Sequence, residues 1–384
     1  MTHILLVASE QMDMHTKRLV GMLLNYRHHV TLVAREEPGF DGRQNYKYFQ
    51  YPHFQILKKI RPHRLRRIII DRVNTIYLRY IWQRSAPDLV HNIYIGNGAY
   101  YCGLAGLSPL VLTALGSDIN DAFEGGNLIW QERIKAALNS SSYITADTTE
   151  VLKRCDALAG KSLRSDLFYF GIDLSLFFRR PGSEIVTLKK KIGIPSDAKV
   201  VLSPRRLTSK MRHDVVVKAF AEYKKSTDQN TRLVFRRFGS YSQEVCADLQ
   251  KLAVELGIGD HVLWLDELPY EELPVLYSAS DLIVNVPEQD GLPVTLFEAS
   301  ACKVPVVTSC LPSYQEFIDK GRYWKVAVGD VDGVAGFMRG ILGGGDHAVG
   351  QSLEVNYDLI RASADQDKCF ANLEKIYFEA GKKQ

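Results

Sequence analysis

The sequence lacks the features that define several large classes of protein. Its 384 residues contain no internal repeat and no low-complexity segment. No apolar run approaches the ~18 residues that a membrane-spanning helix needs. Residues 1–8 have no basic leader and only a short apolar run, so we expect a first buried strand there and not a signal peptide. These absences favour a folded protein of the cytoplasm.

Cysteine is scarce and scattered. The six cysteines form no C-x-x-C pair and stand at positions 102, 155, 246, 302, 310 and 369. Disulfide frameworks and structural zinc sites usually show paired spacing, so free thiols in a reducing cytosol are expected.

Apolar runs alternate with stretches of helical spacing, and this alternation occurs twice along the chain. In the first half, strands are predicted at 4–8, 30–34, 88–91 and 109–113, with a helix over 16–26. In the second half, strands are predicted at 199–203, 233–236, 262–265, 282–286 and 304–308, with a helix over 214–223. This order is typical of parallel sheets covered by helices. Two doubly wound domains would bind a ligand outside the carboxyl ends of their strands, although the same fold serves unrelated functions.

The segment 285–308 carries the clearest chemical signal. A strand ends in the polar turn 287–291, and a helix is expected to begin near Pro293, so its first amides could hold an anion such as a diphosphate. Asp290 precedes this helix and Glu298 lies about two turns along it, so both carboxylates could reach one ligand. The alternative is that Asp290 caps the helix and Glu298 lies on a solvated face.

These residues resemble the signature of glycosyltransferase family 4, the retaining group 1 glycosyltransferases of the GT-B fold. That family has two Glu separated by seven residues, followed by a strand that begins x-Pro-Val-Val, and here Glu298 is followed by 304–307. The resemblance implies that Glu298 holds the ribose of a nucleotide. Asp290 replaces the first Glu and would contact the donor sugar, and Lys303 replaces a family Gly. Donor binding is assigned to four further residues, Gly291, Leu292, Pro293 and Val294.

The stretch 203–210 resembles the G-R-L-x-x-x-K element of the same family. A retaining transfer leaves negative charge on the departing diphosphate, and Arg and Lys are the groups that stabilise it. Lys210 is the matching lysine. Arg205 has the family spacing to Lys210, whereas Arg206 is the arginine followed by Leu, so either is a candidate for the phosphate contact.

The first half resembles a family subgroup at three places. They are 8–18, with His15, then 87–94, with His91, and 112–118, with Ser117 and Asp118. The resemblance implies that these residues contact the acceptor or the donor sugar. The alternative for His15, His91 and Asp118 is local, either a helix cap or a hydrogen-bonded side chain at a strand end.

Two further observations bear on the donor site. The loop 309–316, where the family has two glycines, contains Pro312 and no glycine. This composition disfavours a tight cradle of amides, and an unusual donor site is the alternative. The D-x-D at Asp330 and Asp332 is flanked by glycines and is typical of a turn. No metal and no cofactor is expected.

The expected fold is therefore GT-B, with two Rossmann-like doubly wound α/β domains facing a cleft. Residues 1–172 would form the acceptor domain, with a C-terminal helix at about 365–384 crossing back onto it, and 173–364 the nucleotide-sugar domain. The expected function is transfer of a sugar from a nucleotide-sugar donor to a glycan or lipid-linked acceptor, in cell-surface polysaccharide or glycoconjugate biosynthesis. The alternatives are a GT-B nucleotide-sugar epimerase and a catalytically weak nucleotide-binding relative.

The segment 58–84 is strongly basic. It holds nine Lys and Arg residues and one acid, Asp71, in a chain whose net charge is only +4. Apolar and aromatic residues interleave with the basic ones, a pattern that fits a helix lying on an anionic membrane, here the inner face of the cell membrane. An amphipathic helix packed on its own domain fits equally well. Nucleic acid is not expected as a partner, because no nucleic-acid motif accompanies the charge.

Overall fold

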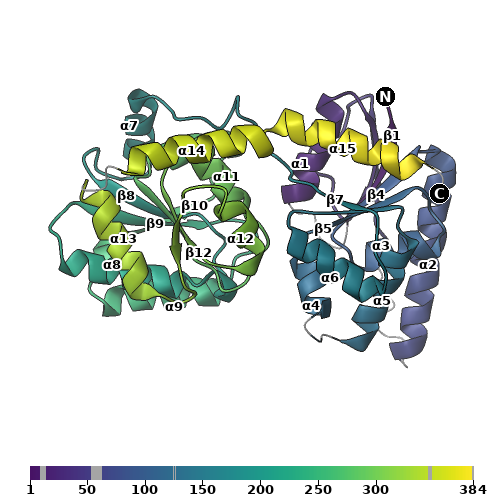
Figure 1. Cartoon of the computed structure of the whole chain (residues 1–384), viewed down its shortest axis with the longest axis horizontal. Helices are drawn as coiled ribbons and strands as arrows, with labels where there is room; N and C mark the ends of the chain where they lie inside the picture. The colour runs from purple at the N-terminus through teal and green to yellow at the C-terminus, as the bar shows by residue number, and fades with distance from the viewer. Residues whose placement is uncertain (9–13, 53–62, 124, 126, 345–347, 383–384) are drawn as a thin grey trace. The chain divides into compact units, whose positions relative to one another are not determined.

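The structure, a computed structural model, describes residues 1–8, 14–52, 63–123, 125, 127–344 and 348–382. The chain forms two compact units, residues 1–170 with 369–384 and residues 171–368. Each unit is a parallel β-sheet covered by helices (Figure 1).

The first unit contains a seven-stranded sheet of order β3-β2-β1-β4-β5-β6-β7, in which all paired strands are parallel. Its strands are β1 (His3–Ala8), β2 (His29–Ala34), β3 (Tyr46–Gln50), β4 (Leu89–Ile93), β5 (Leu110–Ala114), β6 (Tyr143–Ala146) and β7 (Ser165–Leu167). Its helices are α1 (Met14–Asn25), α2 (His63–Ser85), α3 (Asn97–Leu104), α4 (Ser117–Phe123), α5 (Leu128–Ser140), α6 (Thr149–Ala159) and α15 (Gln366–Gly381).

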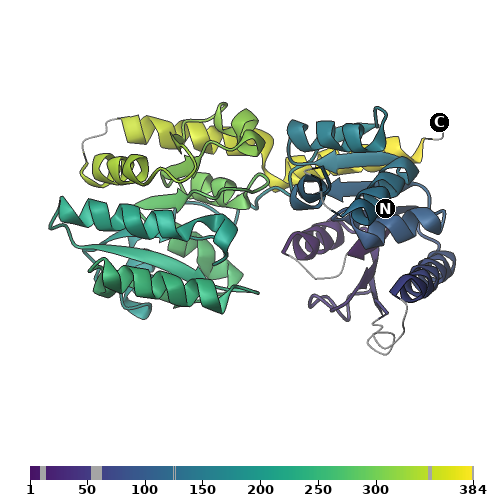
Figure 2. The same ribbon diagram turned by 90° about the horizontal axis from the view of Figure 1, so that it is seen from below.

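Both faces of this sheet are buried under helices (Figure 2). On one face, Leu23 of α1 and Leu373 of α15 join the core. On the other, Leu78 of α2 and Ile134 of α5 do so. Because both faces are covered, the central strands are continuous apolar runs, which is why the sequence predicts them well.

The second unit contains a six-stranded sheet of order β10-β9-β8-β11-β12-β13, again parallel at every pair. Its strands are β8 (Lys199–Ser203), β9 (Thr231–Arg237), β10 (Val262–Asp266), β11 (Leu282–Asn285), β12 (Val306–Ser309) and β13 (Trp324–Val326). Its α-helices are α7 (Gly182–Lys191), α8 (His213–Lys225), α9 (Gln243–Glu255), α10 (Leu273–Ser278), α11 (Val294–Ala301), α12 (Pro312–Ile318), α13 (Val331–Leu342) and α14 (Ala348–Ser363).

The strand order reverses once in each sheet, between β1 and β4 in the first unit and between β8 and β11 in the second. In doubly wound sheets, ligands bind outside the carboxyl ends of the strands at this point of reversal. The loops after β8 and β11 contain Arg205 and Asp290, so the fold places these two candidates at the point of reversal.

The basic segment forms α2 in the described residues from His63 on, whereas Lys58, Lys59 and Arg61 lie outside the described residues. Leu78 and Ile81 are buried in the core of the first unit. Other apolar residues of this helix remain exposed, Ile76 by 68% and Ile68 by 51%. The helix therefore packs on its own unit and still presents an apolar and basic surface. In the described part of the chain, no helix is both long and apolar enough to cross a membrane.

Candidate functional site

A buried histidine fixes the backbone of the loop after β8. His213, the first residue of α8, is 2% exposed, and its Nδ1 lies 3.0 Å from Oγ of Ser203 at the end of β8. Its Nε2 lies 3.1 Å from the carbonyl oxygen of Arg206. Burial lowers the pKa of His213 to about 4, so the ring is neutral at neutral pH. A neutral ring bonded at both nitrogens fixes the backbone that carries the two candidate arginines.

Arg205 and Asp290 meet at the carboxyl end of the sheet. Nη2 of Arg205 donates to Oδ2 of Asp290 at 2.5 Å, and the two side chains are 22% and 16% exposed. Nε of Arg205 points to Sδ of Met211 at 3.4 Å. A short, partly buried ion pair of this kind holds a guanidinium in one orientation. The suggestion that Asp290 only caps the following helix is wrong, because the N-cap of α11 is Pro293 and has no side-chain cap.

Tyr314 is a further member of this cluster, and the sequence gives no signal for it. Its hydroxyl, from α12, donates to the same Oδ2 of Asp290 at 2.7 Å. Ser313 Oγ donates to the carbonyl oxygen of Asp290, also at 2.7 Å. Burial raises the pKa of Tyr314, and the carboxylate of Asp290 raises it further, so the phenol stays protonated. Ser313 and Tyr314 lie in the first turn of α12, which starts at Pro312. The segment without glycines therefore contacts Asp290 through side chains.

Arg206 and Lys210 are exposed, unlike Arg205. Nη1 of Arg206 reaches Oγ of Ser240 at 3.4 Å, away from Asp290. In the described residues no carboxylate lies within ion-pair distance of the Lys210 ammonium. The carbonyl oxygen of Lys210 accepts from the amide of Glu288 at 3.0 Å, which ties the Lys210 loop to the turn that carries Asp290. The geometry therefore groups Arg205 with Asp290, and Lys210 has no ion-pair partner among the described residues.

Glu298 lies inside the unit and not on a solvated face. It is 7% exposed, and Oε2 accepts from the hydroxyl of Tyr277 at 2.6 Å. Burial raises the pKa of Tyr277, with the carboxylate of Glu298 adding to the effect, so Tyr277 remains a donor. A buried carboxylate held by a tyrosine is suited to accepting hydrogen bonds from hydroxyl groups of a ligand. Of the residues before it, Leu292 and Pro293 are buried, whereas Gly291 and Val294 are half-buried at the start of α11.

The D-x-D sequence serves as a helix cap. Oδ1 of Asp330 accepts from the amide of Gly333 at 2.8 Å, and Asp330 is the N-cap of α13. Its carboxylate is thus occupied by backbone. Within the described ranges, no group of three or more His, Cys, Asp or Glu side chains is arranged to hold a metal ion.

His91 is part of the interior of the first unit. It lies in β4, is 0% exposed, and its Nδ1 and Nε2 lie 2.7 Å from the hydroxyl of Tyr377 and 2.6 Å from Oγ1 of Thr113. Burial lowers the pKa of His91 to about 3. The expectation that His91 contacts the acceptor or the donor sugar is therefore wrong, because both ring nitrogens are used inside the sheet. The alternative, a hydrogen-bonded strand side chain, is the one observed.

Asp118 also points inward, which corrects its assignment as a sugar contact. It is 0% exposed and accepts from the amides of Ile95 at 2.7 Å, Leu115 at 3.1 Å and Ile119 at 3.0 Å. Burial raises the pKa of Asp118 to about 6, although these amides act in the opposite direction. The carboxylate thus ties the loop after β4 to the loop after β5. Ser117 beside it is exposed at the start of α4 and remains a candidate contact.

His15 lies in the first turn of α1, and its ring packs against Phe170 with 4.7 Å between ring centroids. The ring is half-buried. The stretch that joins it to β1, residues 9–13, lies outside the described residues. His15 and Ser117 are therefore the two first-unit candidates that keep a partly accessible side chain.

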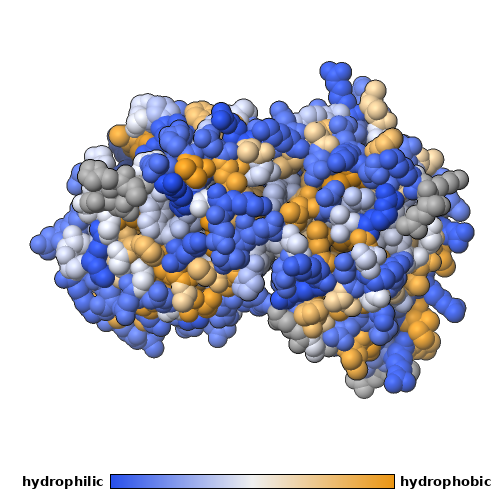
Figure 3. All heavy atoms as spheres, viewed as in Figure 1, coloured by the Kyte–Doolittle hydropathy of each residue, from blue (hydrophilic) through white to orange (hydrophobic). Residues whose placement is uncertain are grey.

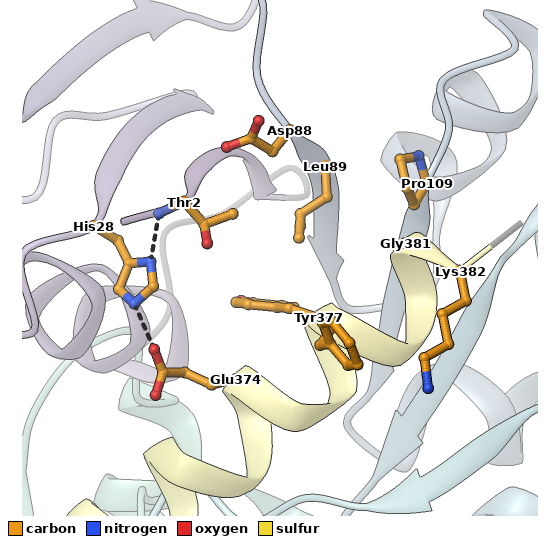
Figure 4. A pocket seen from close by; sticks show the side chains of 10 residues that line it. Thr2, His28, Asp88, Leu89, Pro109, Glu374, Tyr377, Gly381 and Lys382 are labelled. Atoms are coloured by element: carbon orange, nitrogen blue, oxygen red, sulfur yellow. Dashed lines mark hydrogen bonds and ion pairs between the residues drawn. The ribbon is translucent and has the colours of Figure 1, made fainter.

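A cavity of about 420 Å³ lies at the opposite edge of the seven-stranded sheet, near the amino ends of β1 and β4 (Figure 4). Nδ1 of His28 accepts from the amide of Thr2 at 3.3 Å, and its Nε2 lies 3.4 Å from a carboxylate oxygen of Glu374. Burial lowers the pKa of His28, while Glu374 acts in the opposite direction. The cavity contains none of the candidate residues. Since doubly wound sheets bind ligands at the carboxyl ends of their strands, we assign it no part in the chemistry.

Known proteins that are similar to this chain agree with the family resemblance of its motifs. The model of the family "Glycosyl transferases group 1" matches residues 185–340, and that of "Glycosyl transferase 4-like" matches residues 3–148. A D-inositol 3-phosphate glycosyltransferase of Catenulispora acidiphila is 31% identical over 191 residues, which cover 48% of this chain and 45% of the relative. The N-acetyl-alpha-D-glucosaminyl L-malate synthase of Bacillus anthracis is 28% identical over 259 residues, 66% of this chain and 65% of the relative. The similarity thus spans about half to two thirds of the length of these curated relatives.

Solved structures resemble the whole chain in fold. HepE of Anabaena, in complex with UDP and glucose, superposes with a TM-score of 0.75 at 17% identity and covers 98% of this chain and 99% of its own. The sucrose-phosphate synthase of Thermosynechococcus elongatus gives a TM-score of 0.76 at 16% identity, with 99% of each chain covered. At such identities the likeness concerns the fold. That likeness shows the GT-B fold, and the two family models, which match residues 3–148 and 185–340, show that the chain belongs to the group 1 glycosyltransferases.

Proposed function

We propose that this protein is a retaining glycosyltransferase that moves a sugar from a nucleotide-sugar donor to a glycan or lipid-linked acceptor, in the making of a cell-surface polysaccharide or glycoconjugate. The observation that carries the proposal is the cluster at the carboxyl end of β8 and β11. There Arg205 is paired to Asp290 at 2.5 Å, Lys210 lies further along the same connection after β8, and Glu298 is buried in the helix that follows β11.

Each member of the cluster has a part in this proposal. Departure of a nucleoside diphosphate leaves negative charge on the diphosphate, which Arg205 as a fork of donors and Lys210 as a point charge stabilise. The first amides of α11, from Val294 and Thr295, add the positive end of a helix dipole, and Gly291 and Leu292 lie in the turn before them. Glu298 accepts hydrogen bonds from the ribose hydroxyls. Asp290 lies where the donor sugar would be held, and Ser117 and His15 would serve the acceptor or the sugar.

The relatives support donors and acceptors of this kind. HepE was solved with UDP and glucose. A relative in Mycolicibacterium smegmatis, 26% identical over 246 residues, is named a GDP-mannose-dependent phosphatidylinositol monomannoside mannosyltransferase. Both names contain a nucleoside diphosphate and a sugar, whereas the base and the sugar differ between them.

We also propose that the protein works in the cytoplasm and lies on the anionic inner face of the cell membrane through α2. Arg64, Arg67 and Arg72 are exposed on this helix, together with Ile68 and Ile76. Exposed apolar side chains next to arginines suit the boundary between acyl chains and acidic headgroups. Such a location would bring a lipid-linked acceptor to the enzyme.

Calorimetry with UDP-, GDP-, ADP- and dTDP-sugars tests the donor part of the proposal. One nucleotide is expected to bind more tightly than millimolar, and Glu298→Gln should weaken it by roughly tenfold or more, since a hydrogen bond to a charged group contributes about 1.5–3 kcal/mol. Glutamine keeps an acceptor for Tyr277, so the fold should survive. Glu255→Gln, an exposed residue at the end of α9, is the matched control. Failure of all four nucleotide classes to bind would overturn the proposal.

A further inference from the structure

A second cavity of the first unit contains cationic side chains that the proposed donor chemistry leaves unused. It has a volume of about 340 Å³ and opens among the first turns of α2, α3 and α5. Its lining includes His63, Arg66 and Arg67 of α2 and Trp130 and Arg133 of α5. All of these residues belong to the first unit, so the cavity is defined within one compact body.

The floor of this cavity is a buried ion pair. Nη2 of Arg133 donates to both carboxylate oxygens of Asp71, at 2.8 and 2.7 Å, and its Nη1 donates to Oδ1 of Asn97 at 2.5 Å. Arg133 is 8% exposed, and its guanidinium lies 4.8 Å from the centroid of the Tyr100 ring. Arg133 and Asp71 thus neutralise each other and fix the relative position of α2, α3 and α5. The floor is rigid and carries no net charge.

The rim of the cavity is positively charged. His63, Arg66 and Arg67 are spaced i, i+3 and i+4 on α2, so they share one face of the helix, and all three line the cavity. The Arg133–Asp71 pair is neutral, and Arg66 and Arg67 add two cationic side chains to the lining. Arg67 is exposed and forms no ion pair with any of the residues that the structure describes. Two guanidinium groups on one face suit an anion with several oxygen atoms, such as a phosphate.

The backbone also contributes positive potential to the cavity. Asn97 is the first residue of α3, and Asn127 is the N-cap of α5; both line the cavity. The N-cap of α3 is Gly96, which offers no side-chain acceptor to the first amides of that helix. The positive ends of two helix dipoles therefore lie beside the arginines and favour an anion in the same space.

Apolar side chains border the charged rim. Ile129 and Trp130 belong to the wall, and Ile129 is 44% exposed. Leu128 next to it is 77% exposed. In Figure 3 hydrophobic and hydrophilic side chains lie next to one another at the lower right, where α2 runs. A phosphate held at the rim would thus have apolar surface beside its organic part.

We infer that this cavity binds the phosphate of an acidic phospholipid, with Arg66 and Arg67 on the headgroup and Leu128 and Ile129 in the boundary of the acyl chains. The inference rests on the proposed membrane contact and sharpens it, because a defined pocket replaces a diffuse basic surface. It is independent of the donor site, since binding needs neither a nucleotide nor transfer.

The experiment compares two double variants of the full chain that remove the same charge from the same helix. Arg66→Ala/Arg67→Ala removes both arginines of the rim, whereas Arg79→Ala/Arg84→Ala removes two exposed arginines roughly 18 to 26 Å further along α2. Binding is measured by co-sedimentation with vesicles of phosphatidylcholine mixed with phosphatidylglycerol, and with vesicles of phosphatidylcholine alone. The first variant should bind the acidic vesicles roughly thirtyfold more weakly, and the second within about threefold of the wild type. Arg67→Ala alone, at an exposed position, repeats the test should the double variant fold poorly.

A soluble phosphate ester separates the two sources of the same chemistry. Calorimetry with glycerol 3-phosphate that gives heat with the wild type and none with Arg66→Ala/Arg67→Ala supports the pocket as a phosphate site without a bilayer. Equal loss of vesicle binding in both double variants overturns the pocket and leaves only diffuse attraction. Absence of binding to acidic vesicles and to glycerol 3-phosphate overturns the pocket and the membrane contact together, while donor binding by calorimetry would be untouched.

Discussion

The carboxyl ends of the two sheets use polar residues in opposite ways. In the second unit, Arg205 and Asp290 leave the strands, turn to each other and keep part of their surface exposed. In the first unit, His91 and Asp118 turn into the interior and are fully buried. Both pairs stand near strand ends in the sequence and both match family motifs. The residues of the second unit are therefore placed to act on a ligand, whereas those of the first unit stabilise the structure around a site.

The difference follows from the place of each residue relative to its strand. His91 is the third residue of β4, a central strand covered on both faces, so its side chain enters the layer under α15 and meets Tyr377. Arg205 lies two residues after the end of β8, where the backbone has left the sheet. Asp118 follows β5, but three backbone amides converge on its carboxylate. Loops carry function when their side chains are not needed to satisfy the backbone.

The largest effects are expected from the cationic groups of the second unit. Arg205→Ala and Lys210→Ala should each lower turnover by roughly a hundredfold or more, as when one preorganised electrostatic donor is removed. Turnover is measured as release of nucleoside diphosphate from the donor found by calorimetry. Lys210 is exposed, so its variant should melt at the wild-type temperature.

Arg206→Ala is the control, because Arg206 carries the same charge one residue away but points toward Ser240. Its turnover should stay within about threefold of the wild type, since an exposed charge contributes little. A variant of Arg206 as damaged as that of Arg205 would reverse the assignment of the two arginines.

The sequence predicts most of the inner strands and the edge strand β10, but not the inner strand β6 or the edge strands β3, β7 and β13. The strands predicted at 199–203 and 282–286 match β8 and β11, because both faces of those strands are buried and their central residues are apolar. The edge strands β7 and β13 have three residues each and include Asp166 and Lys325, so they resemble loops in the sequence. Short, charged edge strands are common because they discourage pairing with other chains.

The sequence also leaves the site incomplete. From the sequence, Arg205 and Arg206 are equally good candidates for the phosphate contact, because the local backbone conformation decides which of the two side chains faces Asp290. That conformation depends on His213, which bonds to the carbonyl oxygen of Arg206. Tyr314 has no motif at all, since its role comes from the approach of α12 to the turn that carries Asp290. Contacts between segments far apart in the chain of this kind are visible only in three dimensions.

Acid should weaken both units through their buried histidines. The folded-state pKa of His213 is about 4 and that of His91 about 3, both below the ordinary 6.5, so the unfolded chain takes up these protons first as pH falls. Stability is therefore fully present above pH 6.5 and lost toward pH 4, by ~3 kcal/mol for His213 alone. Asp118, with its pKa raised to about 6, opposes this between pH 6 and 3.8 but by a smaller shift.

Urea unfolding at several pH values measures this dependence. His213→Gln removes one titrating group, so its free energy of unfolding should fall less steeply between pH 6.5 and 4 than that of the wild type. An unchanged slope in that variant would show that the ring is not buried as a neutral group. The slope is the informative quantity, because the substitution itself shifts the absolute stability.

His91→Gln tests the interior role of the first-unit histidine. Glutamine cannot reproduce both hydrogen bonds of the ring, so the hydroxyl of Tyr377 or of Thr113 loses its partner inside the sheet. The free energy of unfolding should fall by about 2 kcal/mol, within the range for a buried polar group left unsatisfied. Turnover and KM, measured well below the melting temperature, should match the wild type. A selective rise in the KM for the acceptor would return His91 to the substrate contacts and remove the contrast between the two edges.

A smaller effect is expected at Tyr314. Tyr314→Phe removes one of the two donors to Oδ2 of Asp290 and leaves the Arg205 pair in place. Turnover should fall by about tenfold, because a hydrogen bond to a carboxylate contributes about 1.5–3 kcal/mol and part is recovered from water. Donor affinity should change little if the tyrosine positions the carboxylate and does not touch the ligand. The matched control is Tyr323→Phe, whose hydroxyl lies 3.0 Å from Oγ of Ser300, away from Asp290.

The smallest effect is expected from removal of metal ions. The proposed leaving-group stabilisers are Arg205 and Lys210, and the D-x-D of this chain is occupied as a cap, since Oδ1 of Asp330 already accepts from the amide of Gly333. Turnover in EDTA should therefore equal turnover in magnesium or manganese, because cationic side chains and helix amides take the place of a cation at the diphosphate. Loss of activity in EDTA that manganese restores would assign the charge to a metal. The role of Arg205 would then be to orient Asp290. The residues at the carboxyl ends of the second sheet would in that case position their neighbours, as His91 and Asp118 do in the first unit.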